Sequence, residues 1–323
     1  MIPTLNRPNV LNPQIIKEMK GIKRVDNYLL EEKIGEGQFG TVYRASHVAT
    51  KELFAVKVIP KAKFKNNHLM LRQLKRETSI MNSLQHKNLM YMHRSFETGR
   101  NYYLILDLCE KGDLSKYMRQ NKIKRFSEGE AILIIRQIME GFRELRSKKI
   151  IHRDLKLENV FIRGSTIVLG DFGSAKVVSK MTSTTVGTPL NMAPEIMQGG
   201  DYNNKSDLWS IGGLFYELLI GKPPFFALSI WELKKKALTK SGENLNLQNF
   251  PFICEQVKKL LKGLLEPDPK LRISWADFFN HEIFLSNHNS TCSKIQGSSR
   301  FYIFKETGTN KNLLSSGIFF KTK

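Results

Sequence analysis

The chain has 323 residues, 41% of them hydrophobic and 25% charged, proportions that exclude a largely disordered protein. No apolar run approaches the roughly 18 residues that a membrane-spanning helix needs, and the first residues lack the apolar core of a signal peptide. Three scattered cysteines, Cys109, Cys254 and Cys292, argue against a disulfide framework or a zinc site. We therefore expect a reducing intracellular location, in the cytoplasm or alternatively in the nucleus.

The formal net charge of +21 raises the question of a nucleic-acid or membrane partner. Residues 1–27 carry five basic and two acidic side chains, and residues 286–323 carry six and one, so the remaining charge is spread through the chain between them. No predicted helix has a continuous basic face with interleaved aromatic residues. A solvated basic surface that favours acidic partners is thus preferred over the alternative, a dedicated nucleic-acid site.

The region after residue 27 begins with β-strand patterns separated by turn residues. The strands are expected at Leu29–Leu30, Thr41–Tyr43, Leu53–Ile59, Met90–Phe96 and Tyr102–Leu108. Between the third and fourth strands, apolar residues at spacings of three and four predict a helix over Leu69–Leu84.

After residue 110 the pattern becomes mostly helical. The helices are expected at Glu128–Lys148, Lys205–Ile220, Ile230–Leu238, Glu255–Leu265 and Trp275–Asn280. The second of these is apolar nearly all round and is therefore expected to be buried. Beyond Leu285 the chain is rich in Ser, Asn, Thr and Lys, as in a loosely packed tail. The outline is an α+β protein with a small β-rich lobe followed by a larger helical lobe.

A glycine-rich turn, Gly35-Glu36-Gly37-Gln38-Phe39-Gly40, lies between two predicted strands. Glycines allow a backbone to approach phosphate oxygens without a clash at Cβ. A helix would follow this pattern in a dinucleotide-binding fold, but here a strand follows it. The motif alone fits either a phosphate-binding loop or a plain hairpin.

A lysine, Lys57, lies in the middle of an apolar strand, where an ammonium group needs a partner or a ligand. Glu77, on the predicted helix, could be that partner in a structural salt bridge. Because the glycine turn lies just upstream, we favour a phosphate-binding role for Lys57.

Residues 152–159 read His-Arg-Asp-Leu-Lys-Leu-Glu-Asn, and residues 171–173 read Asp-Phe-Gly. This combination resembles the protein kinase family, and it is too long and too specific to arise from packing alone. The resemblance implies that Asp154 accepts the proton of the substrate hydroxyl and that Lys156 steadies the transferred phosphoryl group. It also implies that Asn159 and Asp171 bind Mg²⁺. A lysine at position 156 is typical of serine/threonine kinases.

The family pattern continues to about Leu285, which implies a bilobal kinase domain over residues 28–285. Its N-lobe would span about 28–106 and its C-lobe 107–285, with an extension at 1–27 and a polar basic tail at 286–323. Residues 187–189 (Gly-Thr-Pro) and 192–195 (Met-Ala-Pro-Glu) match the end of an activation segment. The resemblance implies that Thr188 contacts Asp154, that Asp207 anchors the catalytic loop, and that Arg272 pairs with Glu195.

The resemblance also implies an ATP site. Its residues would be Ile34, Gly35, Gly37, Gly40, Val42, Ala55, Lys57, Glu77, Asp107, Cys109, Asp113 and Phe161. The cofactors would be ATP and Mg²⁺. The implied function is transfer of the ATP γ-phosphate to Ser/Thr hydroxyls of proteins. The alternative is a pseudokinase that binds partners without chemistry, but the lysine, the aspartate and the metal ligands are all present.

Arg153, next to the catalytic carboxylate, indicates control by phosphorylation of the activation segment in this family. Thr184 lies at the usual distance ahead of residues 187–189. We predict that a phosphate on Thr184, added by an upstream kinase, bridges Arg153 and Lys176.

Three acidic residues, Asp113, Glu158 and Glu217, match positions at which basic-directed kinases bind arginines upstream of the target hydroxyl. Asn191 departs from the family, which usually has a Tyr there, so the neighbouring substrate pocket is expected to be unusual. The motifs are similar to those of Unc-51-like, calcium/calmodulin-dependent and NIMA-related kinases, and the subfamily stays open.

Overall fold

The computed structural model describes residues 23–37, 39–65, 67–177, 189–200, 203–227, 229–239 and 245–285. The chain divides into two compact units. One comprises the residues up to Leu71 together with Met92–Leu108, and the other comprises Arg72–Tyr91 and the residues from Cys109 onward. Each unit is described by itself below.

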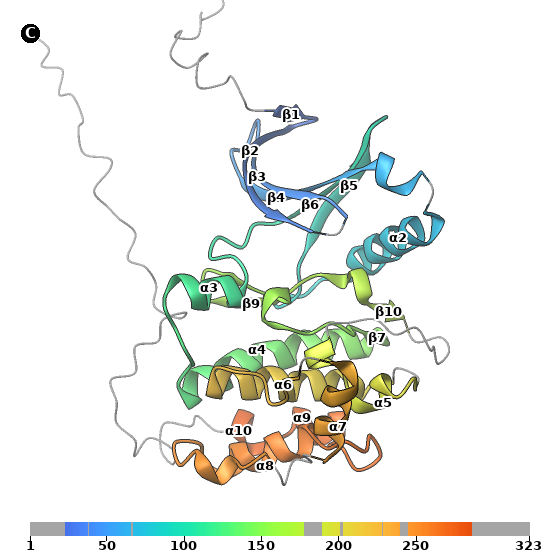
Figure 1. The fold of residues 1–323 in the computed structure, drawn as a ribbon. Helices are drawn as coiled ribbons and strands as arrows, with labels where there is room; N and C mark the ends of the chain where they lie inside the picture. The colour runs from blue at the N-terminus through green and yellow to red at the C-terminus, as the bar shows by residue number, and fades with distance from the viewer. Residues whose placement is uncertain are drawn as a thin grey trace, which may run out of the picture. The chain divides into compact units, whose positions relative to one another are not determined.

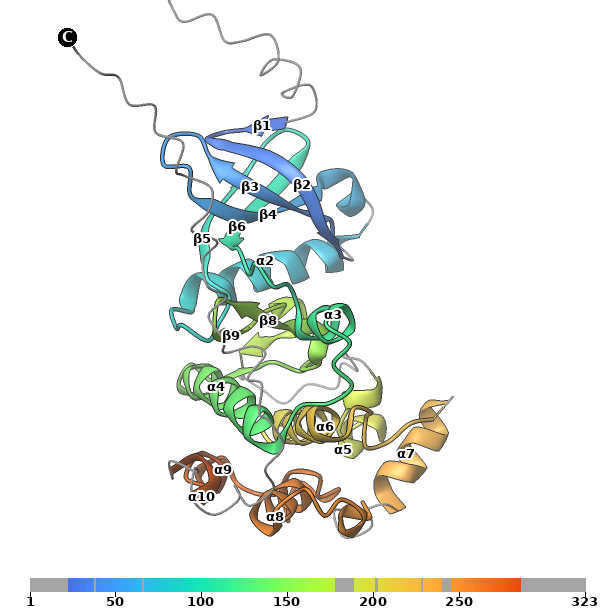
Figure 2. The same ribbon diagram turned by 90° about the vertical axis from the view of Figure 1, so that its left-hand side faces the viewer.

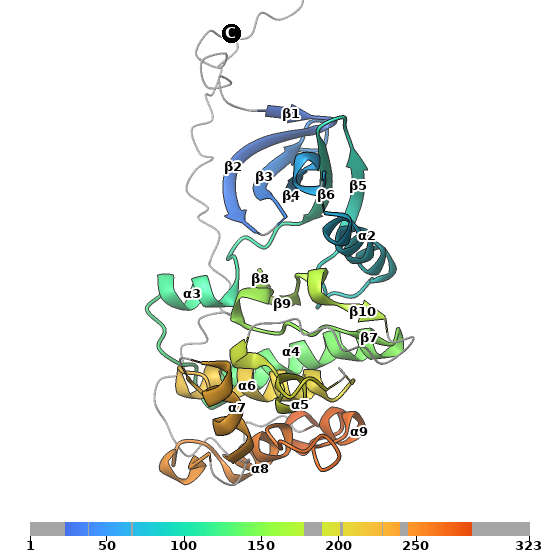
Figure 3. The ribbon, with the colours of Figure 1, turned by 45° about the vertical axis from the view of Figure 1, so that its right-hand side comes forward.

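The first unit is built on a six-stranded antiparallel sheet with the strand order β1-β2-β3-β4-β6-β5, which curls around its own core (Figure 3). The strands are β1 (Lys23–Val25), β2 (Tyr28–Glu36), β3 (Thr41–His47), β4 (Leu53–Pro60), β5 (Met92–Glu97) and β6 (Asn101–Asp107). Tyr28, Val56 and Ile105 belong to the buried cluster on one face of the sheet. A short 3-10 helix, η1 (Lys61–Phe64), follows β4, and helix α2 (His68–Ser83) begins after it.

The second unit is mostly helical (Figure 1). Its helices are α3 (Leu114–Gln120), α4 (Glu128–Ser147), α5 (Pro194–Met197), α6 (Ser206–Ile220), α7 (Ile230–Thr239), α8 (Glu255–Leu264), α9 (Trp275–Phe279) and α10 (Glu282–Leu285), in addition to most of α2. Helix α4 starts at a capping box, in which Ser127 accepts a hydrogen bond from the backbone N–H of Glu130 and the Glu130 carboxylate accepts one in return. Helix α6 packs against α4 and α8 (Figure 2) and is buried along nearly its whole length, as its composition predicts.

Two small antiparallel ribbons in the second unit carry the site. Strand β7 (Ile150–Ile151) pairs with β10 (Lys176–Val177), and β8 (Val160–Arg163) pairs with β9 (Thr166–Leu169). The turns after β7 and β9 hold residues 152–159 and 171–173. Among the described residues, each helix is too short or too polar to cross a bilayer.

Candidate active site

Asp207, in the first turn of α6, holds the backbone of the loop after β7. Its two carboxylate oxygens accept hydrogen bonds from the backbone N–H groups of His152 and Arg153, both at 2.9 Å. Burial raises the pKa of Asp207 above its ordinary value, while nearby His152 and the two amide donors oppose that rise. These two hydrogen bonds fix the backbone of the loop to a buried helix of the unit. Arg153 takes a left-handed conformation (φ 70°) within this turn.

Asp154 is the carboxylate toward which this loop directs two donors. Lys156 donates from Nζ to Asp154 Oδ2 at 3.0 Å, and Asn159 donates from Nδ2 to the same oxygen at 3.1 Å. Asn159 also donates to the backbone carbonyl of Asp154 at 2.7 Å. Three of the four predicted catalytic residues, all but Thr188, therefore lie together, and the aspartate keeps a fixed orientation.

The turn after β9 is tied to the same loop. His152 Nε2 lies 3.1 Å from the carbonyl oxygen of Gly170, and Gly170 donates its N–H to the carbonyl of Asn159 at 2.9 Å. The rings of His152 and Phe172 are 5.5 Å apart. Asp171, between these contacts, has a left-handed backbone (φ 54°), and its side chain is exposed. The structure thus places Asp171 and Asn159 on adjacent, mutually bonded turns.

The donor set of these two turns fits Mg²⁺. Asn159 uses its amide nitrogen for Asp154, so its amide oxygen is the end that can meet a cation. Asp171 adds a carboxylate, and Mg²⁺ prefers few protein oxygens with water and phosphate completing the shell. Within the described residues no cluster of three or more His, Cys, Asp or Glu side chains could hold a metal alone. A Mg²⁺ held by the oxygens of Asn159 and Asp171 would need water or ligand oxygens to complete its shell.

A group of cations lies beside this loop. The guanidinium of buried Arg153 donates from Nε to the carbonyl of Ser174 at 2.6 Å. Burial lowers the pKa of Lys176, and the charges of Arg153 and Arg76 lower it further. Arg76, on α2, was missed by the sequence analysis, because only the fold brings it near residue 176. Thr184 and Thr188 lie outside the described residues.

Glu195 and Arg272 form a bidentate ion pair, with both nitrogen-to-oxygen distances at 2.9 Å. Arg272 is almost fully buried, and its remaining donors reach the carbonyls of Glu266, Lys205 and Pro267. All five N–H groups of the guanidinium therefore have acceptors. The pairing predicted from the motif is present in the structure.

Asn191 has a structural role that its sequence position did not reveal. Its Nδ2 donates to the carbonyl of Leu155 at 2.9 Å, and its own carbonyl accepts a hydrogen bond from Ser210 Oγ of α6 at 2.9 Å. Leu155 lies between Asp154 and Lys156. Asn191 therefore joins the chain that follows the activation segment to the catalytic loop.

The three predicted substrate-binding carboxylates differ in their surroundings. Asp113 caps α3 by accepting a hydrogen bond from the N–H of Lys116 at 2.7 Å. Glu217, on α6, has its pKa raised to about 7, first by burial and then by the charge of Glu158. Glu158 is exposed. Glu217 and Glu158 are thus close enough to share an electrostatic environment.

The glycine turn belongs to the first unit and forms the connection between β2 and β3. Gly37 and Gly40 exchange backbone hydrogen bonds of 2.9 and 3.2 Å. A Cβ at Gly40 would collide with the backbone of Val58, so only glycine fits there. Ile34 and Gly35 lie on β2, and Val42 lies on β3.

The other predicted nucleotide-binding residues are divided between the two units. Ala55 and Lys57 lie on β4 and Asp107 ends β6, all in the first unit. Lys57 Nζ is 5.5 Å from the centre of the Phe39 ring. The second unit contains Glu77, Cys109, Asp113 and Phe161. Their joint role in nucleotide binding stays a prediction.

Comparison with known proteins supports the resemblance to protein kinases that the sequence motifs indicate. A family model described as "Protein kinase domain" matches residues 28–284. The chain is 35% identical over 280 residues to "Serine/threonine-protein kinase atg1" of Dictyostelium discoideum, covering 84% of this chain and 41% of that protein. It is 34% identical to "Serine/threonine-protein kinase 33" of Mus musculus, covering 88% and 59% of the two chains, and 34% identical to "Serine/threonine-protein kinase ULK3" of Rattus norvegicus, covering 81% and 55%.

The matched region spans only about two fifths to three fifths of the length of these relatives. The match to the family model extends from Tyr28, at the start of β2, to Phe284, in α10. The curled sheet of the first unit and the helices of the second are those of the bilobal kinase fold. This chain therefore belongs to the protein kinase family.

Proposed function

We propose that the protein is a serine/threonine kinase that transfers the γ-phosphate of ATP to Ser/Thr hydroxyl groups of proteins. The observation that carries this proposal is the arrangement around Asp154, whose carboxylate is held by Lys156 and Asn159 beside the exposed carboxylate of Asp171. A pseudokinase would have no need to preserve this set of side chains together.

In the proposed reaction, Asp154 accepts the proton of the substrate hydroxyl as its oxygen bonds to the γ-phosphorus and ADP leaves. Lys156 places a positive charge where the transferred group gains negative charge. Asn159 and Asp171 would hold Mg²⁺, which neutralises charge on the phosphates. Asp207 keeps the loop in place through its two backbone hydrogen bonds.

The direct test is transfer of ³²P from [γ-³²P]ATP to a basic protein substrate in the presence of Mg²⁺, with the Asp154→Asn variant beside the wild type. We expect activity in the wild type and a loss of at least about a hundredfold in the variant, as for removal of a general base. If both proteins stay inactive after treatment with activating kinases, while nucleotide binding persists, the protein is a scaffold instead.

Regulation and substrate choice extend this proposal. The basic group formed by Arg153, Lys176 and Arg76 would bind a phosphate on Thr184 and so order the activation segment. The partly buried Glu217, with Glu158, would favour substrates with Arg or Lys before the target hydroxyl. Cys109 and Cys254, the cysteines in the described part of the chain, form no disulfide bond, which fits a reducing location such as the cytoplasm or nucleus.

A further inference from the structure

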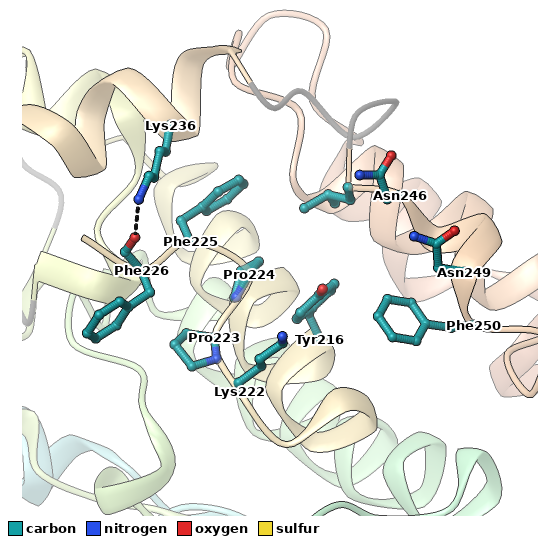
Figure 4. A pocket seen from close by; sticks show the side chains of 11 residues that line it. Tyr216, Lys222, Pro223, Pro224, Phe225, Phe226, Lys236, Asn246, Asn249 and Phe250 are labelled. Atoms are coloured by element: carbon teal, nitrogen blue, oxygen red, sulfur yellow. Dashed lines mark hydrogen bonds between the residues drawn. The ribbon is translucent and has the colours of Figure 1, made fainter.

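A cavity of 320 Å³ lies in the helical unit, away from the catalytic loop in the sequence (Figure 4). Its walls are the last part of α6, residues 222–226, the helix α7 and residues 245–250. We call it the α7 groove. From its lining and its charge, we infer that it is a docking site for an acidic segment of a partner protein that inserts an apolar side chain.

The floor of the α7 groove is aromatic. Tyr216 and Phe225 are buried, and the ring of Tyr216 meets Phe250 edge to face at a centroid distance of 6.4 Å. Phe226, also in the lining, is 62% exposed. An exposed aromatic side chain beside a cavity is typical of sites where a partner buries an anchor residue.

The groove is also held in shape. Lys236 donates from Nζ to the carbonyl of Phe226 at 2.8 Å and pairs with Glu232 at 2.7 Å, so residues 222–226 are fixed to α7 (Figure 4). Trp231, on α7, is 71% exposed, and Lys235 Nζ lies 5.5 Å from the centre of its ring. A preformed cavity needs less ordering when a ligand binds, which favours affinity.

The rim of the groove is positively charged. Two lysines line the cavity: Lys222, which is exposed, and Lys236, which pairs with Glu232; Lys234 and Lys235 lie on α7 outside the lining. A second basic segment adjoins it, because a Cβ at Gly221 would collide with the backbone of Lys124. The guanidinium of Arg125 stacks on Phe252 at 4.1 Å, and Phe252 contacts Phe250 of the groove. The aromatic floor therefore continues beneath a basic border.

The positive charge of the rim indicates which kind of ligand the α7 groove binds. Residues 1–22 carry three basic side chains and one acidic one, and residues 286–323 carry six and one, so neither end of this chain complements the rim. A second copy, with a net charge of +21, would also be repelled. In an acidic segment, the carboxylates would pair with the basic rim, and an aromatic or branched aliphatic side chain would pack on the aromatic floor. This inference concerns binding alone and does not depend on phosphotransfer.

The test uses the full chain as bait for a displayed library of random 12-residue peptides, and it then measures the affinity of selected peptides by fluorescence anisotropy. We expect the enriched peptides to combine Asp or Glu with an apolar anchor. The groove variants Lys222→Glu and Phe226→Ala should each weaken their binding by about five- to tenfold, as expected for a rim charge and a hot-spot residue.

Matched controls are Lys87→Glu, a charge reversal outside the groove, and Leu133→Ala, a loss of an exposed apolar side chain on α4. Both should bind the peptides as the wild type does. The inference is overturned if enriched peptides lack acidic residues, or if they bind the groove variants and the wild type equally. It is also overturned if an oligonucleotide displaces the peptides and loses affinity with the same groove variants, because the site would then serve nucleic acid.

Discussion

Asn191 is expected to act as a positioning residue. Its amide donates to the carbonyl between Asp154 and Lys156 in the sequence, so replacing it with Leu leaves a buried acceptor without a donor. Such a loss costs about 1–3 kcal/mol of stability. Since the loop would shift, we predict that Asn191→Leu lowers kcat by about ten- to a hundredfold. Steady-state kinetics should show little change in the KM for ATP.

Ser210→Ala supplies the control for this prediction. It removes the hydrogen bond from Ser210 to the carbonyl of Asn191. The hydrogen bond from the Asn191 side chain to the carbonyl of Leu155 is kept. A merely structural role for Asn191 would make the two variants lose stability and kcat in parallel. A positioning role predicts similar losses of stability, measured by urea unfolding, with a much larger loss of kcat in Asn191→Leu.

We predict that Glu217 makes substrate choice depend on pH. Its pKa is about 7, so the side chain is mostly neutral at pH 6 and mostly ionised at pH 8. If this carboxylate binds an upstream arginine, the preference for an Arg-containing peptide over its Leu counterpart should rise across that range. The ratio of the two kcat/KM values measures this preference. Glu217→Gln should keep the ratio low and flat, and an equally steep rise in the variant would contradict the assignment.

The same group affects stability. Burial raises the folded-state pKa of Glu217 from 4.5 to about 7, so the folded protein holds this proton more tightly than the unfolded chain does. The stability contributed by the proton is therefore complete below pH 4.5 and is lost as the pH rises through 7. Glu217→Gln should gain about 1 kcal/mol over the wild type at pH 8, because solvent screens part of the penalty at this partly exposed position. Urea unfolding should show that gain shrinking toward pH 5.

At the scale of elements, periodicity predicted the longer helices well. Helices α2, α4, α6, α7, α8 and α9 begin and end within one residue of the predicted bounds. Helix α3 and the short elements β1, β7, β10, α5 and α10 were not predicted. Segments of two to four residues show no periodicity, and they form because a partner lies beside them in the fold. β1, for example, adds to the edge of β2 within the stretch that the sequence assigned to an extension.

In the β8–β9 ribbon, Phe161 of β8 and Gly170, the residue after β9, form a pair whose close packing helps to position the turn that holds Asp171. A Cβ at Gly170 would lie 2.7 Å from Cε2 of Phe161, which is too close for the ring to stay. We predict that Gly170→Ala costs about 1–3 kcal/mol, as overpacking does. It should also lower activity, because Gly170 bonds to Asn159 and His152.

A compensating change tests this explanation. Phe161→Leu removes the ring, so the double variant Gly170→Ala/Phe161→Leu should recover most of the stability lost in Gly170→Ala. Thermal unfolding of the two single variants and the double variant forms a complete cycle. Additive losses would show that the contact between residues 161 and 170 is not the reason for glycine at this position.

At the scale of the whole molecule, the sequence predicted which residues make up the site, but few of the side-chain interactions that hold them in place. Asp154, Asn159 and Asp171 could be predicted from the motifs, because phosphoryl transfer requires a proton acceptor and metal ligands of these residue types. The hydrogen bond from Asn191 to Leu155 and the electrostatic effect of Arg76 on Lys176 depend on segments far apart in the chain, and no local pattern encodes them. The α7 groove likewise needs four separate segments to be folded before it exists.

The ion pair between Glu195 and Arg272 joins two such distant segments, 77 residues apart. Because Arg272 is almost fully buried and uses all five donors, lysine cannot replace its contacts. We predict that Arg272→Lys lowers the free energy of unfolding by about 3–5 kcal/mol, the usual cost of breaking a buried pair. Glu195→Gln keeps a hydrogen-bond acceptor but leaves the arginine charge without its counterion, so it should lose a comparable amount.

Urea unfolding of both variants beside the wild type measures this cost, and the exposed pair of Lys236 with Glu232 offers a control. Glu232→Gln should change stability by less than about 1 kcal/mol, since solvent already screens that pair. If Arg272→Lys were as mild as Glu232→Gln, the buried pair would contribute little to holding α5 against the chain before α9.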